Sequence, residues 1–68
     1  MQTYIVVLTR WLPWIRVDIM TVEAESAYQA TGVVYQGFGE EDKKIAWTLA
    51  AYSIDHIDRV TVFESPAL

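Results

Sequence analysis

The chain has 68 residues, of which nine are Asp or Glu and five are Lys or Arg, so its formal net charge is −4. This length predicts one domain, residues 1–68, since domains typically run ~50–250 residues. The sequence contains no cysteine and a single histidine, His56. These counts exclude a disulfide-stapled scaffold and a Cys/His zinc site, and they favour a reducing compartment.

Apolar residues are more abundant than one small core needs. They make up 53% of the chain, and nine residues are aromatic. Because a domain of about 60 residues buries only roughly 60% of the surface of its unfolded chain, we expect a homodimer or a partner protein to cover the remainder. The longest strongly apolar run, Tyr4 to Leu8, is far shorter than the ~20 residues of a membrane span. With no signal-peptide pattern, the sequence predicts a cytoplasmic protein without membrane contact.

The first half of the chain predicts an antiparallel hairpin. Residues 3–9 are rich in β-branched side chains and contain neither Gly nor Pro, which is typical of a strand covered on both faces. Residues 10–14 form the turn, because Pro13 lacks the N–H that a central strand requires. A second strand is expected over residues 15–23. Ile15, Val17 and Ile19 share one face of this strand, and the apolar positions that follow lie on the other, which favours a bulge near Ile19.

A helix is predicted for residues 27–36. Ser26 is placed as its N-cap and Gln29 three residues later as the partner in a capping box, while glycines at positions 37 and 39 end it. Gly32 inside the helix costs about 1 kcal/mol relative to Ala, which favours a close approach to the sheet. The residues expected on the inner side are Ala27, Ala30, Val33, Val34 and Gly37.

Residues 39–53 fit two patterns. As a strand, Ile45, Trp47 and Leu49 alternate with more polar positions; as a helix, the acidic residues 40–42 complement the N-terminus. The strand is preferred because the helix leaves Trp47 on the outer face. Residues 54–58 then turn, residues 59–64 form the last strand, and residues 65–68 form a short flexible tail. The predicted fold is α+β in the order ββαββ, with one helix on an antiparallel sheet; the alternative, with a second helix at about 40–53, is ββααβ.

No pattern of residues predicts an enzyme or a cofactor site. Ser53, Asp55, His56 and Asp58 lie within six residues, but a catalytic triad needs its groups arranged in three dimensions around the nucleophile. A polar turn, in which Ser53 or Asp55 bonds neighbouring backbone N–H groups, explains them better. The acidic residues 40–42 lack the spacing of a Ca²⁺ loop, so no metal site is predicted.

Two tryptophans are the sharpest feature. Trp11 and Trp14 flank Pro13 at the predicted hairpin tip, with Arg10 and Arg16 on either side. Tryptophan is enriched at interface hot spots because it removes a large area from water at a low entropy cost. We therefore predict that both tryptophans anchor a partner protein, flanked by the two arginines. In the alternative, both fold back over the sheet and close the core.

Acidic residues gather in the middle of the chain. Six of them, with no Lys or Arg among them, lie between Arg16 and Lys43. Glu40, Glu41 and Asp42 are second-rank candidates for contact with a basic site on a nucleic-acid-binding partner; the alternative is ordinary solubility and helix-dipole complementation. Direct binding of nucleic acid is disfavoured, because the five basic residues are few and scattered.

The segments YIVVLT, TVEAES, AYQA and RVTVFE, in that order, resemble the small accessory proteins of bacteriophages, anti-CRISPR inhibitors among them. The resemblance covers most of the chain but is architectural, so it assigns no functional residue. It implies a non-enzymatic inhibitor of a host defence or nucleic-acid-processing protein, acting in the host cytoplasm. The alternatives are a self-associating homodimeric module and a small regulator that grips single-stranded nucleic acid with its Arg-Trp hairpin tip.

Overall fold

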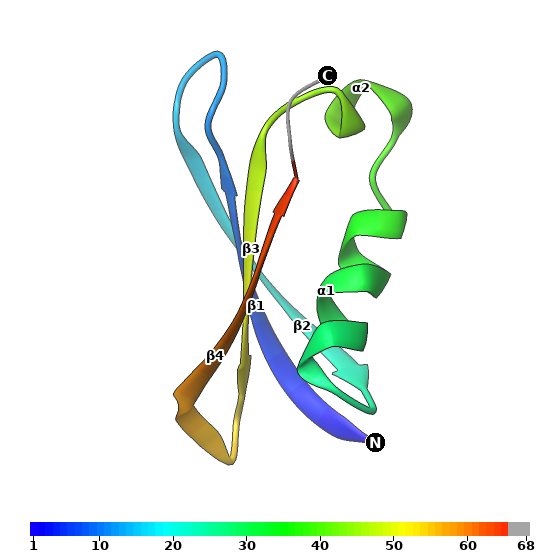
Figure 1. The fold of residues 1–68 in the computed structure, drawn as a ribbon, viewed down its shortest axis with the longest axis vertical. Helices are drawn as coiled ribbons and strands as arrows, with labels where there is room; N and C mark the ends of the chain where they lie inside the picture. Colours follow the sequence, from blue (N-terminus) through cyan, green and yellow to red (C-terminus); the bar gives the residue numbers. More distant parts are fainter. Residues whose placement is uncertain (66–68) are drawn as a thin grey trace.

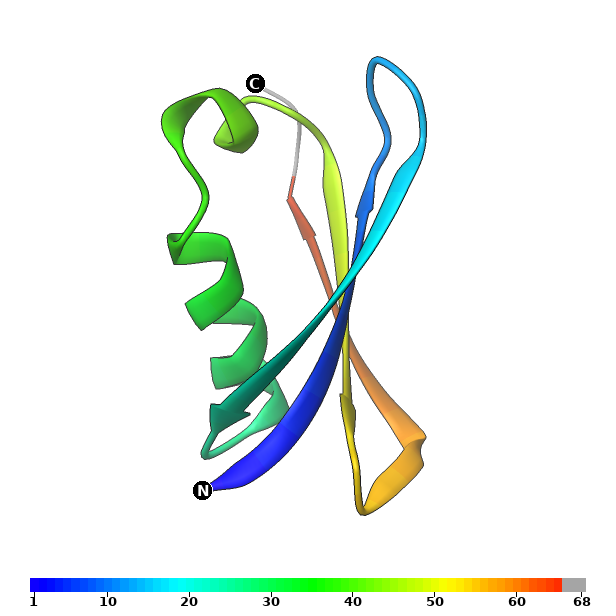
Figure 2. The same cartoon turned by 180° about the vertical axis from the view of Figure 1, so that it is seen from behind.

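The computed structural model describes residues 1–65, with only the backbone for residues 56–59. The predicted α+β fold is confirmed: four antiparallel strands form one sheet, and a helix packs on it (Figure 1). The elements are β1 (Gln2–Arg10), β2 (Arg16–Ala24), α1 (Ala27–Gln36), α2 (Glu40–Lys43), β3 (Trp47–Ser53) and β4 (His56–Ser65). Both helices lie on the same side of the sheet, as Figure 2 shows from behind.

The strand order is β2-β1-β3-β4, so β1 and β3 are central and β2 and β4 are the edges. The chain returns from β2 through both helices to pair β3 with the free side of β1. The expected bulge near Ile19 is wrong, because β1 and β2 pair without a register shift from Gln2 opposite Ala24 to Arg10 opposite Arg16. The apolar phase changes simply because both faces of β2 carry apolar residues. The register shift of the sheet lies instead at Tyr52/Ser53.

The core lies between α1 and one face of the sheet. Alternate residues of the two central strands point into it, which is the period-2 pattern of a strand with one buried face. The expectation that both faces of the first strand are covered is therefore wrong, because both helices lie on one side of the sheet. An aromatic group continues this core: the Phe38 ring lies 4.6 Å from the Trp47 ring, and the Tyr35 ring 5.2 Å from the Phe63 ring. The buried apolar residues are Tyr4, Val6, Leu8, Ala24, Ala30, Val34, Trp47, Leu49 and Ala51.

The N-terminus of α1 is capped as the sequence predicts. The Ser26 hydroxyl accepts a hydrogen bond from the Gln29 N–H at 3.0 Å. The Gln29 side chain reaches back as in a capping box, but it accepts from the N–H of Glu25, at 2.6 Å, rather than from that of Ser26. Two backbone donors at the helix start are thereby satisfied.

The predicted inner side of α1 is partly wrong. Ala30 and Val34 are buried as expected, but Val33 and Gly37 are exposed. Thr31 takes the inner place of Val33. Burial of its hydroxyl is tolerated because the hydroxyl donates to the Tyr28 carbonyl at 2.8 Å.

The expected close approach at Gly32 is also wrong. A Cβ placed on this residue would meet nothing within 4 Å, so the glycine faces open space. Its position in the helix therefore has no packing reason in the described structure.

Residues 39–53 combine the two predicted patterns. Residues 40–43 form the single helical turn α2, and the strand begins only at Trp47. The preferred strand is thus confirmed over 47–53, where Trp47 and Leu49 point inward as predicted. The Trp47 indole donates to the Asp42 carbonyl at 2.9 Å, and this bond holds the helical turn against the start of the strand.

The last strand is longer than predicted. It begins at His56, so the expected turn over 54–58 shortens to Ile54 and Asp55. Ser65, expected in the flexible tail, is the last residue of β4 and is buried, with its hydroxyl 3.4 Å from that of Tyr35. The rest of the predicted tail, residues 66–68, lies outside the described residues.

Candidate functional site

The hairpin tip, residues 11–15, connects β1 to β2 and projects from the sheet away from the helices (Figure 1). Trp14 is 71% exposed, and Leu12 and Ile15 are exposed on either side of it. Trp11 is also exposed, to 46%. Its indole donates to the Thr48 hydroxyl at 2.8 Å, and its backbone N–H donates to the Ala46 carbonyl at 3.1 Å. The tip therefore has a fixed base at Trp11 and an exposed apolar end at Trp14.

The two candidate arginines lie at the base of this tip. Arg10 and Arg16 are opposite each other at the ends of β1 and β2. The Nε of Arg16 lies 3.3 Å from an oxygen of Asp18, so its charge is partly compensated. Arg10 is half-buried beside Trp47, and its Nε is enclosed without a hydrogen-bond partner among the described residues. This arrangement does not form a track of free cations for phosphates.

The acidic candidates Glu40, Glu41 and Asp42 form the first turn of α2, and all three are exposed. Their carboxylates complement the positive end of this short helix. Lys43, the next residue, places its ammonium 5.5 Å from the centre of the Tyr35 ring. Since Trp11 bonds the segment between α2 and β3, the hairpin tip and the acidic turn lie at the same end of the molecule (Figure 1).

The described residues bring together no evident catalytic or metal-binding group. The Ser53 hydroxyl accepts a hydrogen bond from the Asp55 N–H at 3.3 Å, which is the polar turn that the sequence favours. His56 and Asp58 are described only in their backbone, so nothing is concluded about their side chains. Among the described residues, no three His, Asp or Glu side chains could together hold a metal ion.

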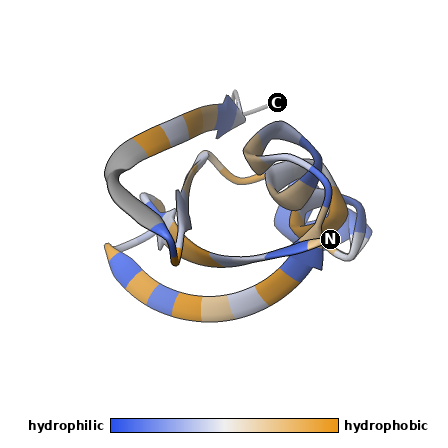
Figure 3. Cartoon of the chain, turned by 90° about the horizontal axis from the view of Figure 1, so that it is seen from below, coloured by the Kyte–Doolittle hydropathy of each residue, from blue (hydrophilic) through white to orange (hydrophobic). Residues whose placement is uncertain are grey.

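A second apolar surface lies on the helix-free side of the sheet, and we call it the open face. The register places one apolar row across all four strands and a second, partly polar row beside it. Figure 3 shows hydrophobic and hydrophilic positions alternating along part of β2, the strand at the lower edge of that view. The open face comprises Ile5, Val7, Val17, Ile19, Ala50, Tyr52, Val60 and Val62.

Sequence reasoning found parts of the open face but not the whole. The shared face of Val17 and Ile19 follows from alternation, and this is confirmed. The assembly of four strands into one uncovered surface depends on the strand order, to which no local pattern points. The one usable signal is that both strand faces are apolar while the chain has a single long helix to cover them.

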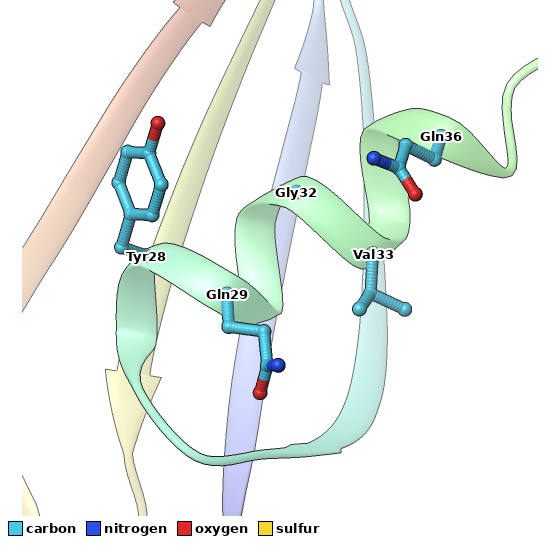
Figure 4. A pocket seen from close by; sticks show the side chains of 5 residues that line it. All are labelled: Tyr28, Gln29, Gly32, Val33 and Gln36. Atoms are coloured by element: carbon cyan, nitrogen blue, oxygen red, sulfur yellow. The ribbon is translucent and has the colours of Figure 1, made fainter.

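A shallow hollow lies on the outer side of α1. It has a volume of about 340 Å³, and its walls are Tyr28, Gln29, Gly32, Val33 and Gln36 (Figure 4). The missing side chain at Gly32 creates the space between the others. The lining offers two amides and one phenol, with no carboxylate, imidazole or thiol. This composition supplies no nucleophile-base pair.

Comparison with protein-family models, with curated proteins and with solved structures finds no match. The resemblance to phage accessory proteins therefore stays a hypothesis. Within the described part of the chain, no helix has the length and apolar character to cross a membrane.

Proposed function

We propose that this chain is a non-enzymatic protein-binding module that inserts its hairpin tip into a larger protein. The observation that carries the proposal is the 71% exposure of Trp14. A tryptophan left in water forgoes the burial of a large apolar area, whereas in a partner's pocket it becomes a typical hot spot. Leu12 and Ile15 extend the apolar contact on both sides of it.

The fixed base of the tip favours tight binding. The Trp11 indole is held by Thr48, and its backbone by Ala46. A loop ordered before binding loses less conformational freedom on association than a mobile one does. The tip is thus suited to a preformed concave site on its partner.

The narrower proposal is an inhibitor of a host defence or nucleic-acid-processing protein, of the kind that phages encode. Its support is the architectural resemblance, together with the charge of −4 and the exposed acidic turn at the end of the molecule that carries the tip. A basic site on the target would be attracted by Glu40, Glu41 and Asp42, while Trp14 supplies the apolar anchor.

The test is an affinity capture from bacterial lysate with three baits: the wild-type chain, Trp14→Ala and Tyr28→Ala. Tyr28 is 78% exposed on α1, so it is a matched exposed aromatic away from the tip. We expect one host protein on the wild-type and Tyr28→Ala baits and its loss from Trp14→Ala, with at least tenfold weaker binding of the purified target. Equal capture by all three folded baits would contradict the proposal.

A further inference from the structure

The open face is an apolar surface that no element of the described structure covers. Ile19 and Val17 on one edge strand and Val60 and Val62 on the other are exposed, Ile19 to 69%. Ile5, Val7, Ala50 and Tyr52 between them are half-buried. Both helices pack on the opposite side (Figures 1 and 2). The domain therefore has two layers, the helices and the sheet, and the apolar residues on the outer face of the sheet have no third layer to cover them.

We infer that a second copy of this chain covers the open face, so that the protein forms a symmetric dimer with the two sheets face to face. The apolar row Ile19, Val7, Ala50 and Val62 runs across the whole sheet and carries no charge. A neutral apolar surface offers nothing that would select a charged partner. It matches itself, which is the requirement of an isologous twofold interface.

The area available reaches the lower limit for such a dimer. The exposed fractions of the open-face residues, together with that of neighbouring Trp11, whose indole is bonded to Thr48, correspond to roughly 600 Å² per chain, or about 1,200 Å² for the pair if all of this area is covered. This is the lower end of the ~1,200–2,000 Å² range of specific interfaces. We therefore expect a reversible dimer with a dissociation constant of micromolar order rather than an obligate one.

The margins of the face fit a rim. Thr9 and Thr48 lie opposite each other in the next row, followed by Glu64 on β4, and Glu23 lies at the far end of β2. Polar groups surrounding an apolar centre are the usual anatomy of a protein interface. Sheets packed face to face lie about 10 Å apart, a distance that interdigitated Val and Ile side chains fill.

The test is sedimentation velocity from low micromolar to millimolar concentration on the wild type and three variants. Ile19→Lys and Val62→Lys place a charge on the same face from opposite edges of the sheet. Met20→Lys is the matched control, because Met20 neighbours Ile19 and is 45% exposed but shares the helix-covered side with Val6. Circular dichroism confirms that each variant is folded.

We expect the wild type to dimerise, Ile19→Lys and Val62→Lys each to weaken the dimer at least tenfold, and Met20→Lys to change it less than threefold. A wild type that stays monomeric to millimolar concentration would overturn the inference and leave the face to another protein. Loss with Ile19→Lys and Met20→Lys but not with Val62→Lys would overturn it in favour of edge pairing through β2. None of these variants alters Trp14, so the dimer can be tested independently of host-protein capture by the tip.

Discussion

The Trp11 indole donates a hydrogen bond to the Thr48 hydroxyl at 2.8 Å, joining two residues that are 37 positions apart in the chain. The bond ties the base of an exposed hairpin to a central strand. It also distinguishes Trp11 from Trp14, although the sequence predicts the same anchoring role for both. Trp11 is bonded to a central strand at the base of the hairpin, whereas Trp14 is 71% exposed.

Thr48→Val should loosen the hairpin tip without unfolding the protein. Valine keeps the shape and strand preference of threonine but cannot accept the indole N–H. The loss should cost about 0.5–1 kcal/mol, the usual net value of an exposed hydrogen bond. Urea denaturation measures the stability, and hydrogen exchange of the Trp11 indole measures the local effect. The control is Thr9→Val, since Thr9 lies directly opposite Thr48. Equal indole exchange in the two variants would contradict the anchoring role.

Gly32→Ala should stabilise the protein by about 0.5–1 kcal/mol, because alanine favours the helix and a new methyl group meets no atom within 4 Å. Gly37→Ala is the comparison, as its Cβ would lie 3.4 Å from the Val34 carbonyl that accepts the capping N–H. Thermal unfolding should rank Gly32→Ala above Gly37→Ala. Destabilisation by Gly32→Ala would contradict this prediction and would indicate that the helix approaches the sheet closely at Gly32.

Leu49→Ala should destabilise the fold by about 2–5 kcal/mol, because this side chain is fully buried between the sheet and α1. For a domain of this size, whose total stability is roughly 3–10 kcal/mol, such a loss approaches unfolding. Val33→Ala should change stability by less than ~0.5 kcal/mol, since half of Val33 is exposed. Guanidinium titration compares the two, and similar costs would mean that α1 is rotated from its described position.

Features set by neighbouring residues could be predicted from the sequence. The alternation of Trp47 and Leu49, the Ser26 cap and the Ser53 turn depend on contacts within a few positions, and all are confirmed. Features set by distant contacts could not. The face of α1 that packs on the sheet is one example, since the structure buries Thr31 in place of the expected Val33.

The features that could not be predicted depend on contacts between residues far apart in the sequence or on side-chain bonds to the backbone. The return of β3 to the free side of β1 fixes the strand order and leaves one sheet face uncovered. Within residues 39–53, the bond from the Trp47 indole to the Asp42 carbonyl joins a helical turn to the start of a strand. For the candidate site, the exposure of Trp14 follows the sequence prediction for a hairpin tip. The bonding of Trp11 departs from it, because its partner comes from the other half of the chain.

The central claim, that Trp14 is a free anchor on a fixed base, is tested most directly by the three tryptophan indole signals in a ¹H–¹⁵N spectrum. The measurement is made on Ile19→Lys, so that self-association does not mask exposure. We predict rapid solvent exchange of the Trp14 indole proton, with slower exchange for Trp11, bonded to Thr48, and for Trp47, bonded to Asp42. A Trp14 indole as protected as that of Trp47 would contradict the claim, because it would show that Trp14 is buried or bonded rather than free in solvent.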